Sequence, residues 1–142
     1  MTAERSDCIF CKIVVGETPS ETVYEDDLVV CIKDIKPAST HHYLILPKRH
    51  IDNARVLQSQ EDGETLEHMV KTLPIVSEKL GFDLLETRTG FHWPPFTSIS
   101  HLHLHIISPV GDMGFFAKLM FLPNSLWFVS IDYVRSRLRA CS

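Results

Sequence analysis

Three histidines alternate with apolar residues near the end of the chain: His101, His103 and His105. This alternation is typical of a half-buried β-strand, because successive strand side chains point to opposite faces of a sheet. Imidazole is the side chain with an unperturbed pKa closest to neutrality. Three imidazoles on one face of a strand therefore indicate proton or phosphate chemistry.

Strand geometry limits how these histidines can act together. Residues two apart are separated by roughly 6.6 Å along a strand, and residues four apart by roughly 13 Å. A Zn–N bond is only about 2 Å long, so one metal ion bound by all three histidines is not expected. The spacing favours an extended substrate along the strand, with His103 at the reacting atom as a nucleophile.

The surrounding pattern predicts the elements that position these residues. Short apolar runs bounded by turn residues indicate strands. From Ser59 to about Leu80, apolar residues recur at three- and four-residue spacings, which indicates a long helix. Antiparallel strands with one long helix and shorter helices place the chain in the α+β class. The predicted strands are residues 23–32 (a hairpin), 42–47, 85–88, 101–107 and 127–129, and the predicted helices are 59–80 and 130–138.

Length, charge and cysteine content narrow the classes of function. The 142 residues are expected to form one domain, residues 1–142, with a short flexible N-terminus. The net charge of -4 gives no electrostatic case for binding nucleic acid or a membrane surface. No stretch resembles a membrane span or a signal peptide, so we expect a cytoplasmic location, with the nucleus as a second one. In that compartment, the four cysteines are not expected to form disulfides.

The run from His101 to Ile107 matches the signature of the histidine triad (HIT) superfamily: histidine, apolar, histidine, apolar, histidine, two apolar residues. Four further segments resemble the Hint branch of this superfamily, the histidine triad nucleotide-binding proteins. The resemblance covers about residues 7–130. The four segments are Cys8–Ile13, Glu25–Asp27, Asp34–Pro37 and Leu44–Ile51.

The resemblance implies a fold and an activity. The Hint branch has a small α+β fold, is usually dimeric and binds purine nucleoside monophosphates. Its members hydrolyse adenosine 5′-monophosphoramidates to AMP and an amine. We therefore expect a homodimeric hydrolase that acts on P–N bonds of AMP conjugates, with acyl-adenylates as an additional substrate class. Two alternatives stay open: removal of AMP from adenylated nucleic-acid ends, as in aprataxin, and a nucleotide-binding scaffold with weak catalysis.

The resemblance also assigns roles to the phosphate-site residues. His103 would attack the α-phosphorus and form a covalent nucleotidyl-histidine. His101 and His105 would hold phosphate oxygens and set the tautomer of His103. His42 matches the upstream active-site histidine of the family, and Ser98 matches its phosphate-contacting serine. A phosphoryl transition state gathers charge on its oxygens, so donors aimed at them would supply much of the catalysis.

A second group of residues matches the nucleoside site of the family. Asp34 matches the carboxylate that binds the ribose hydroxyls, and the same residue is also suited to a turn. Four apolar residues match the slot for the base, although each alone would read as ordinary core. They are Ile9, Phe10, Ile13 and Ile35.

The chain departs from the best-known Hint pattern just before Ser98. A glycine-rich loop with a substrate-contacting asparagine is replaced by the Pro-rich segment 90–96. This segment resembles the third Hint paralogue group and the catalytic domain of aprataxin. His92 and Trp93 within it either line the leaving-group side of the site or belong to a packed loop.

Cys8 and Cys11 form a C-x-x-C pair. A thioredoxin-like role would need a βαβ setting, which the sequence lacks. Some bacterial relatives bind zinc with this pair and two histidines, which correspond here to His50 and His101. Phosphoramidate hydrolysis needs no metal. The pair is therefore either two buried thiols or part of a structural zinc site, and no cofactor is required for catalysis.

Overall fold

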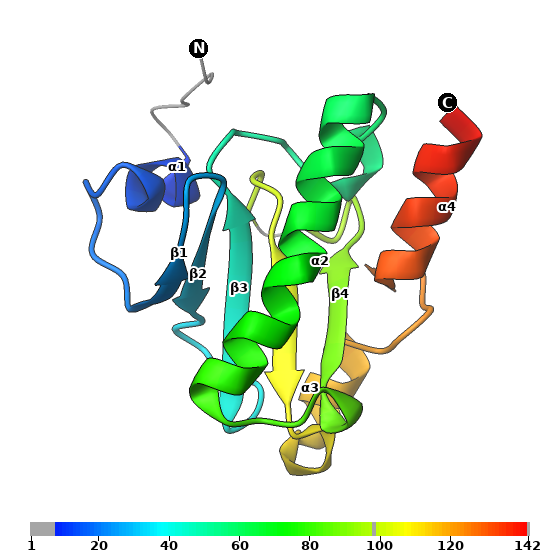
Figure 1. Cartoon of the computed structure of the whole chain (residues 1–142). Helices are drawn as coiled ribbons and strands as arrows, with labels where there is room; N and C mark the ends of the chain where they lie inside the picture. Colours follow the sequence, from blue (N-terminus) through cyan, green and yellow to red (C-terminus); the bar gives the residue numbers. More distant parts are fainter. Residues whose placement is uncertain (1–7, 98, 142) are drawn as a thin grey trace.

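The computed structural model describes residues 8–97 and 99–141, and it shows a six-stranded antiparallel sheet with a few helices (Figure 1). The strand order is β1-β2-β3-β5-β4-β6. This architecture confirms the α+β prediction. The strands are β1 Thr22–Glu25, β2 Val29–Lys33, β3 His41–Pro47, β4 Arg88–His92, β5 Leu104–Ser108 and β6 Phe128–Val129. The α-helices are α1 Ile9–Val14, α2 Gln60–Leu80, α3 Phe115–Met120 and α4 Ile131–Cys141, and short 3₁₀ turns are η1 Ala54–Val56, η2 Leu84–Glu86 and η3 Val110–Asp112.

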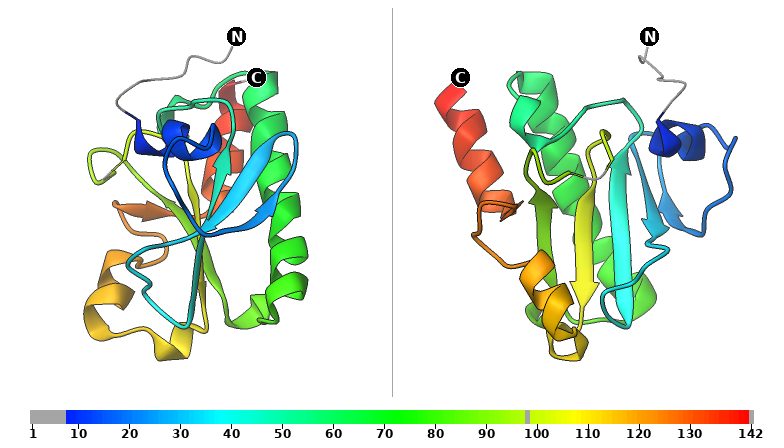
Figure 2. Two further views of the ribbon diagram at one scale, coloured as in Figure 1. Left: turned by 90° about the vertical axis from the view of Figure 1, so that its left-hand side faces the viewer. Right: turned by 180° about the vertical axis from the view of Figure 1, so that it is seen from behind.

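The two faces of the sheet are covered differently (Figure 2). α2 and α4 pack on one face over the main apolar cluster. α1 and α3 lie near opposite corners of the other face, each over a smaller apolar cluster. The odd and even positions of each strand therefore face two different environments, as the period of a strand requires.

α2 is the predicted long helix, and its ends follow standard capping chemistry. Ser59 accepts from the Asp62 backbone N–H, and the Asp62 side chain accepts from the Ser59 N–H in return, which makes a capping box. Gly81 ends the helix at a φ of 77°, a left-handed conformation that favours glycine. The helix runs uninterrupted through Pro74. No helix within the described ranges is both long and apolar enough to cross a membrane.

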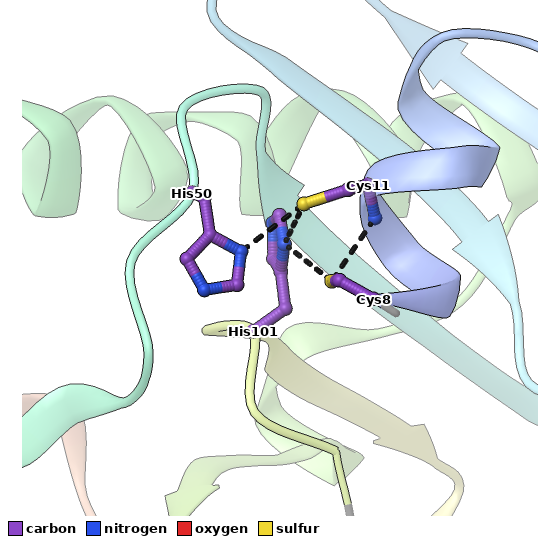
Figure 3. A group of neighbouring side chains, drawn as sticks. All are labelled: Cys8, Cys11, His50 and His101. Atoms are coloured by element: carbon purple, nitrogen blue, oxygen red, sulfur yellow. Dashed lines mark hydrogen bonds between the residues drawn. The ribbon is translucent and has the colours of Figure 1, made fainter. Parts of the chain in front are cut away.

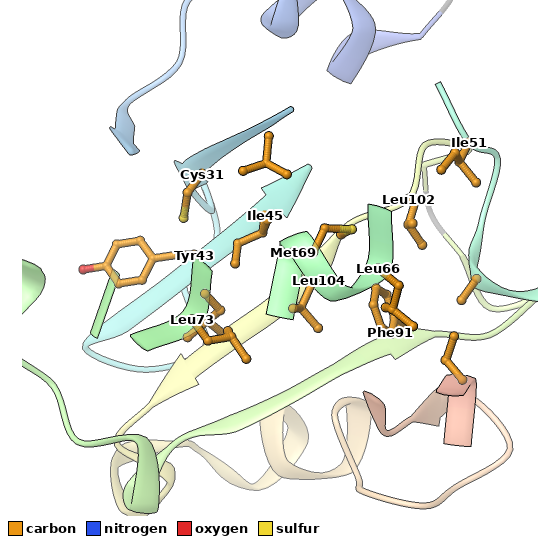
Figure 4. Packing of buried hydrophobic residues seen from close by; sticks show 14 of the residues in the cluster. Cys31, Tyr43, Ile45, Ile51, Leu66, Met69, Leu73, Phe91, Leu102 and Leu104 are labelled. Atoms are coloured by element: carbon orange, nitrogen blue, oxygen red, sulfur yellow. The ribbon is translucent and has the colours of Figure 1, made fainter. Parts of the chain in front are cut away.

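One stripe of α2 packs against the centre of the sheet (Figure 4). Leu66 and Met69 are fully buried and meet Ile45 of β3 and Leu104 of β5. Burying such a side chain contributes roughly 1.5 to 3 kcal/mol. This packing holds β3 and β5 together, and these are the two strands that carry His42 and His105.

Two predicted strands begin later than expected. The histidine strand starts at Leu104, so His101 and His103 lie in the irregular segment before it. Here the Pro47 carbonyl at the end of β3 accepts from the His101 ring, in place of a backbone donor from a neighbouring strand. The strand predicted from residue 85 starts at Arg88. Asp83 caps a 3₁₀ turn in front of it.

Candidate active site and cysteine cluster

His42 and His105 meet on the face of the sheet opposite α2. β3 and β5 are antiparallel, with Leu44 opposite His105 and His42 opposite Ile107. Residues on the same face at this diagonal spacing are close enough for ring contact. The His42 Nε2 atom lies 3.0 Å from the His105 Nδ1 atom. Both side chains are buried, with 2% of His42 and 5% of His105 exposed.

Hydrogen bonds determine which ring nitrogen carries the proton in each histidine of this pair. The Ala38 backbone N–H donates to His42 Nδ1 over 2.9 Å, so a neutral His42 carries its proton on Nε2. That proton faces His105 Nδ1 at 3.0 Å and the Asp34 carboxylate at 3.3 Å. His105 Nδ1 then acts as an acceptor, and His105 carries its own proton on Nε2. Asp34, His42 and His105 together are called the relay below.

The relay ends in a buried donor. His105 Nε2 has no hydrogen-bond partner within the described part of the chain. A buried N–H without a partner costs about 1 to 3 kcal/mol. Such groups in folded proteins call for an explanation, and a ligand oxygen would provide the missing acceptor.

His103 is held in the tautomer that a nucleophile needs. Its Nδ1–H donates to the His101 backbone carbonyl over 2.7 Å, which leaves a lone pair on Nε2. The ring is 8% exposed and packs edge-on between Phe10 and His105, at centroid distances of 5.1 and 5.0 Å. A buried imidazole with one nitrogen anchored and the other free can attack an electrophile.

The histidines of this face are uncharged at neutral pH. Burial lowers the pKa of His103 to about 4. Burial also lowers the pKa of His105 and of His92. For His42, burial lowers the pKa despite the opposing effect of the Asp34 carboxylate. Desolvation penalises the cationic form of each ring, so the relay donates hydrogen bonds as neutral N–H groups.

The relay does not suit a metal ion, although its three ligand atoms lie within 4.8 Å of one another. A metal would need a lone pair on His42 Nε2. The Ala38 N–H already occupies the lone pair on His42 Nδ1, so Nε2 is the protonated atom of the neutral ring. The geometry therefore favours hydrogen-bond donation over metal binding.

The expected nucleoside residues lie around α1 and the loop after β2. Asp34 is half-buried; one carboxylate oxygen accepts from the Lys36 N–H at 2.8 Å and the other faces His42. Phe10 is 5% exposed and packs with Ile13 in the cluster under α1. Ile9 is 40% exposed. Ile35 is 93% exposed and lies outside that cluster.

The Pro-rich segment contributes one residue to the site. His92 lies on the histidine face, with its ring 5.0 Å from that of His105, and its Nε2 donates to the Met120 carbonyl over 3.2 Å. Trp93 packs against Tyr133 of α4 and joins the cluster on the opposite face. His92 is the last residue of β4 and Trp93 follows it, and the two side chains lie on opposite faces of the sheet. Ser98, the expected phosphate contact, lies outside the described residues.

The imidazole of His101 points toward Cys8 and Cys11 (Figure 3). Its Nδ1 lies 3.4 Å from Sγ of both Cys8 and Cys11, and its Nε2–H donates to the Pro47 carbonyl over 2.9 Å. The expectation that this ring holds a phosphate oxygen is therefore wrong. His101 does set the tautomer of His103, but through its backbone carbonyl.

Cys8, Cys11, His50 and His101 form what is called the cysteine cluster below, with all four ligand atoms within 4.8 Å of one another. Cys8 is the N-cap of α1, so the first turn of the helix brings Cys11 beside it. His50 points its Nδ1 at Cys11 Sγ, 3.1 Å away, and anchors its Nε2–H on Asp52 at 2.8 Å.

The cysteine cluster fits a tetrahedral zinc ion. Both histidines place their protonated Nε2 on an oxygen acceptor, so both Nδ1 lone pairs point inward. Metal-ligating histidines are anchored in this way. Zinc bond lengths of about 2.3 Å to sulfur and 2.0 Å to nitrogen put sulfur and nitrogen ligands about 3.5 Å apart. The sulfur–nitrogen distances here are 3.1 to 3.4 Å.

The sequence did not reveal the backbone groups that orient the histidines or the aromatic residues that pack around the site. The Ala38 N–H and the Pro47 carbonyl are backbone atoms, which no side-chain pattern reveals. Phe121 and Phe128 pack against the His105 ring at 5.0 and 6.0 Å. A Cβ on Gly90 would lie 2.6 Å from the Val129 carbonyl oxygen and 2.7 Å from the Phe128 ring. Glycine at this position therefore allows Phe128 and Val129 to lie this close to β4.

Comparison with known proteins agrees with this architecture. The profile of the family described as "Scavenger mRNA decapping enzyme C-term binding" matches residues 7–121. The mouse (Mus musculus) protein named "Adenosine 5'-monophosphoramidase HINT3" is 44% identical over 94% of this chain and 82% of its own length. An Arabidopsis thaliana protein named "Bifunctional adenosine 5'-phosphosulfate phosphorylase/adenylylsulfatase HINT4" is 43% identical over 69% of this chain and 67% of its own length.

The solved structures give the same result. A "HIT family hydrolase" from Clostridium thermocellum superposes with a TM-score of 0.70 at 37% identity, over 78% of this chain and 96% of that one. The sequence motif, the fold and these relatives agree on one classification: the chain belongs to the histidine triad superfamily.

Proposed function

We propose that this protein hydrolyses adenosine 5′-monophosphoramidates to AMP and an amine, through a covalent nucleotidyl intermediate on His103. The name of the mouse relative, an adenosine 5′-monophosphoramidase, supports the substrate class. The observation that carries the mechanism is the 2.7 Å hydrogen bond from His103 Nδ1 to the His101 carbonyl, which leaves Nε2 free to attack. We further expect the same site to accept acyl-adenylates.

The reaction divides into two displacements at the α-phosphorus. His103 Nε2 forms a bond to phosphorus as the P–N bond breaks, and the amine leaves with the bonding electrons and a proton from solvent. Water then attacks the nucleotidyl-histidine, the bond to Nε2 breaks, a proton returns to solvent and AMP departs. Splitting the transfer in this way replaces one difficult step by two easier ones.

The relay supplies the charge stabilisation. His105 Nε2–H is a buried donor that a phosphate oxygen would satisfy, and His42 holds His105 in that tautomer. A pre-aimed donor costs no reorganisation when charge develops on the phosphoryl oxygens. In this scheme, Asp34 binds the ribose, and Phe10 packs near the base. Ser98 is assigned a phosphate contact from the family motif alone.

Turnover of an AMP–amine conjugate tests the proposal. The His103→Ala variant should lose amine release by at least about 10³-fold, while AMP still binds with near-normal affinity. His41→Ala is the matched control, because His41 bonds to Tyr43 and packs on Phe82 on the opposite face. Near-normal turnover by His103→Ala would overturn the assignment.

A second substrate class is favoured by the Arabidopsis relative that is named an adenylylsulfatase. Adenosine 5′-phosphosulfate presents the same adenylyl group with sulfate as the leaving group. Rates on this compound, on an AMP–amine and on an adenylated DNA end should rank the AMP–amine highest. A highest rate on the DNA end would favour the aprataxin-like alternative, and slow turnover of all three with tight AMP binding would favour a scaffold.

We also propose that the cysteine cluster binds a structural zinc ion through Cys8, Cys11, His50 and His101. The converging lone pairs and anchored Nε2 atoms support this. Metal analysis of protein purified without a histidine tag should give about one zinc per chain. Less than about half an equivalent would contradict the proposal.

The homodimer and the cytoplasmic location stay predictions, testable by light scattering and by imaging.

A further inference from the structure

His101 belongs to both centres of the molecule. Its ring is part of the cysteine cluster, and its carbonyl accepts the hydrogen bond that orients His103. Both ring nitrogens are engaged, with the two sulfurs on one side and the Pro47 carbonyl on the other. The side chain is fully buried, with 0% exposed. The ring therefore has no freedom to turn while the cluster is intact.

The peptide bond between His101 and Leu102 is held from two sides. Its carbonyl accepts from His103 Nδ1 at 2.7 Å, and its N–H donates to the Ile51 carbonyl at 2.6 Å. Ile51 directly follows His50, which contacts Cys11 in the cluster. A single loop thus anchors the ring of His101 through His50 and the peptide of His101 through Ile51.

We propose that Cys8, Cys11 and His50 are positioning residues for the His103 nucleophile, acting through the His101 carbonyl. The inference rests on the proposed function of His103. Loss of the cluster releases the His101 ring, and the carbonyl no longer selects the Nδ1–H tautomer of His103. The Nε2–H tautomer has no lone pair directed at the substrate, so only a fraction of the molecules can react.

The effect should appear in the chemical step and not in binding. Removal of groups that orient an active residue typically costs 10- to 100-fold in activity. His50 is the best residue to change, because it lies outside α1 and is not part of the apolar cluster that contains Phe10. His50→Ala should lower kcat about 10- to 100-fold with KM changed by less than about threefold. His50→Cys, which restores a zinc ligand, should recover most of the loss.

His68→Ala is the matched control. His68 Nε2 lies 2.8 Å from Asp26, just as His50 Nε2 lies 2.8 Å from Asp52, but His68 is on α2 and faces away from the triad. This substitution removes an equivalent histidine–carboxylate contact without touching the cluster. It should leave kcat and the tautomer of His103 unchanged.

The decisive readout is the tautomer of His103, measured by ¹⁵N NMR of the full chain. The parent protein should show Nδ1–H, and His50→Ala should show a mixture of tautomers. Cys11→Ser, which keeps the side-chain size, gives the same comparison if His50→Ala does not fold. An unchanged tautomer in the folded variant, or a kcat loss no greater than in His68→Ala, would overturn the inference. Absence of turnover in the parent protein would count against the proposed function alone, because the tautomer still tests the coupling.

Discussion

The relay and the cysteine cluster each contain two histidines, but the ring nitrogens of these histidines are oriented in opposite ways. Each gathers potential metal ligands within 4.8 Å, and each includes two histidines. In the cluster, oxygen acceptors hold the Nε2–H of both histidines, so lone pairs converge. In the relay, the Ala38 N–H holds the Nδ1 lone pair of His42, so a proton points inward. The hydrogen-bond partner of the other ring nitrogen therefore decides whether a histidine is suited to bind a metal or to donate a hydrogen bond.

The largest effect that separates the two regions should come from His105→Ala. Removing the buried Nε2–H donor should lower kcat about 10²- to 10³-fold, the usual cost of losing a pre-aimed donor to a developing anion. Zinc content should not change, because His105 is not part of the cluster. Steady-state kinetics and metal analysis of the same preparation test the expected fall in kcat and the expected zinc content. Loss of zinc from His105→Ala would show that His105 also supports the cysteine cluster.

Cys8→Ala should differ from His105→Ala by losing zinc, in addition to the fall in kcat expected for any loss of the cysteine cluster. It removes one of the four cluster ligands and the side chain that caps α1, so zinc should be lost and the melting temperature should fall by about 5 to 10 °C. Thermal unfolding with and without added zinc measures this. His42→Ala serves as the comparison, since it should keep its zinc. Equal zinc loss in both variants would contradict the division of roles.

Asp34→Asn should give a smaller change, confined to binding. The carboxylate would lose its charge-assisted bonds to the ribose, so KM should rise about 10-fold while kcat changes little. The amide oxygen can still accept from the Lys36 N–H, so the local turn is expected to persist. Steady-state kinetics separate the two constants. If turnover at saturating substrate instead drops by an order of magnitude while KM stays the same, Asp34 acts as an essential orienting group of the relay.

The pH dependence should distinguish the relay from ordinary surface histidines. Burial holds the pKa of His42 and His105 below the usual 6.5, so turnover should stay level from about pH 8 to about pH 6. Below pH 6.5 the unfolded chain binds protons that the folded chain does not. Stability is therefore fully present above pH 6.5 and declines as the pH falls further. An activity profile with an apparent pKa near 6.5 would contradict the neutral relay.

The sequence predicted that His42, His103 and His105 lie together but not how their rings are oriented. The alternation of His103 and His105 with apolar residues placed both on one face, and the helical spacing around Leu66 and Met69 identified α2. His101 was misassigned because its strand position says nothing about which nitrogen meets which partner. Those partners are the Pro47 carbonyl and two cysteine sulfurs more than 50 residues away.

The remaining errors have the same origin in long-range contacts. The strand start at Leu104 depends on where β3 and β4 offer backbone partners, which the local pattern does not encode. His92 and Trp93 were grouped because they are adjacent in the sequence. His92 is the last residue of β4 and lies on the histidine face, whereas Trp93 packs against Tyr133 of α4 on the other face. Phe121 and Phe128, which pack against the His105 ring, come from a region in which we identified no sequence motif.

In the proposed mechanism, His103 Nε2 carries the nucleotidyl group. Rapid acid-free quenching of the reaction with an adenylated amine, followed by peptide mass spectrometry, tests it most directly. We expect one adenylyl group on the peptide that contains His103, and none in the His103→Ala variant. An adduct on another residue, or AMP formation without any adduct while His103→Ala retains its rate, would show that His103 is not the nucleophile.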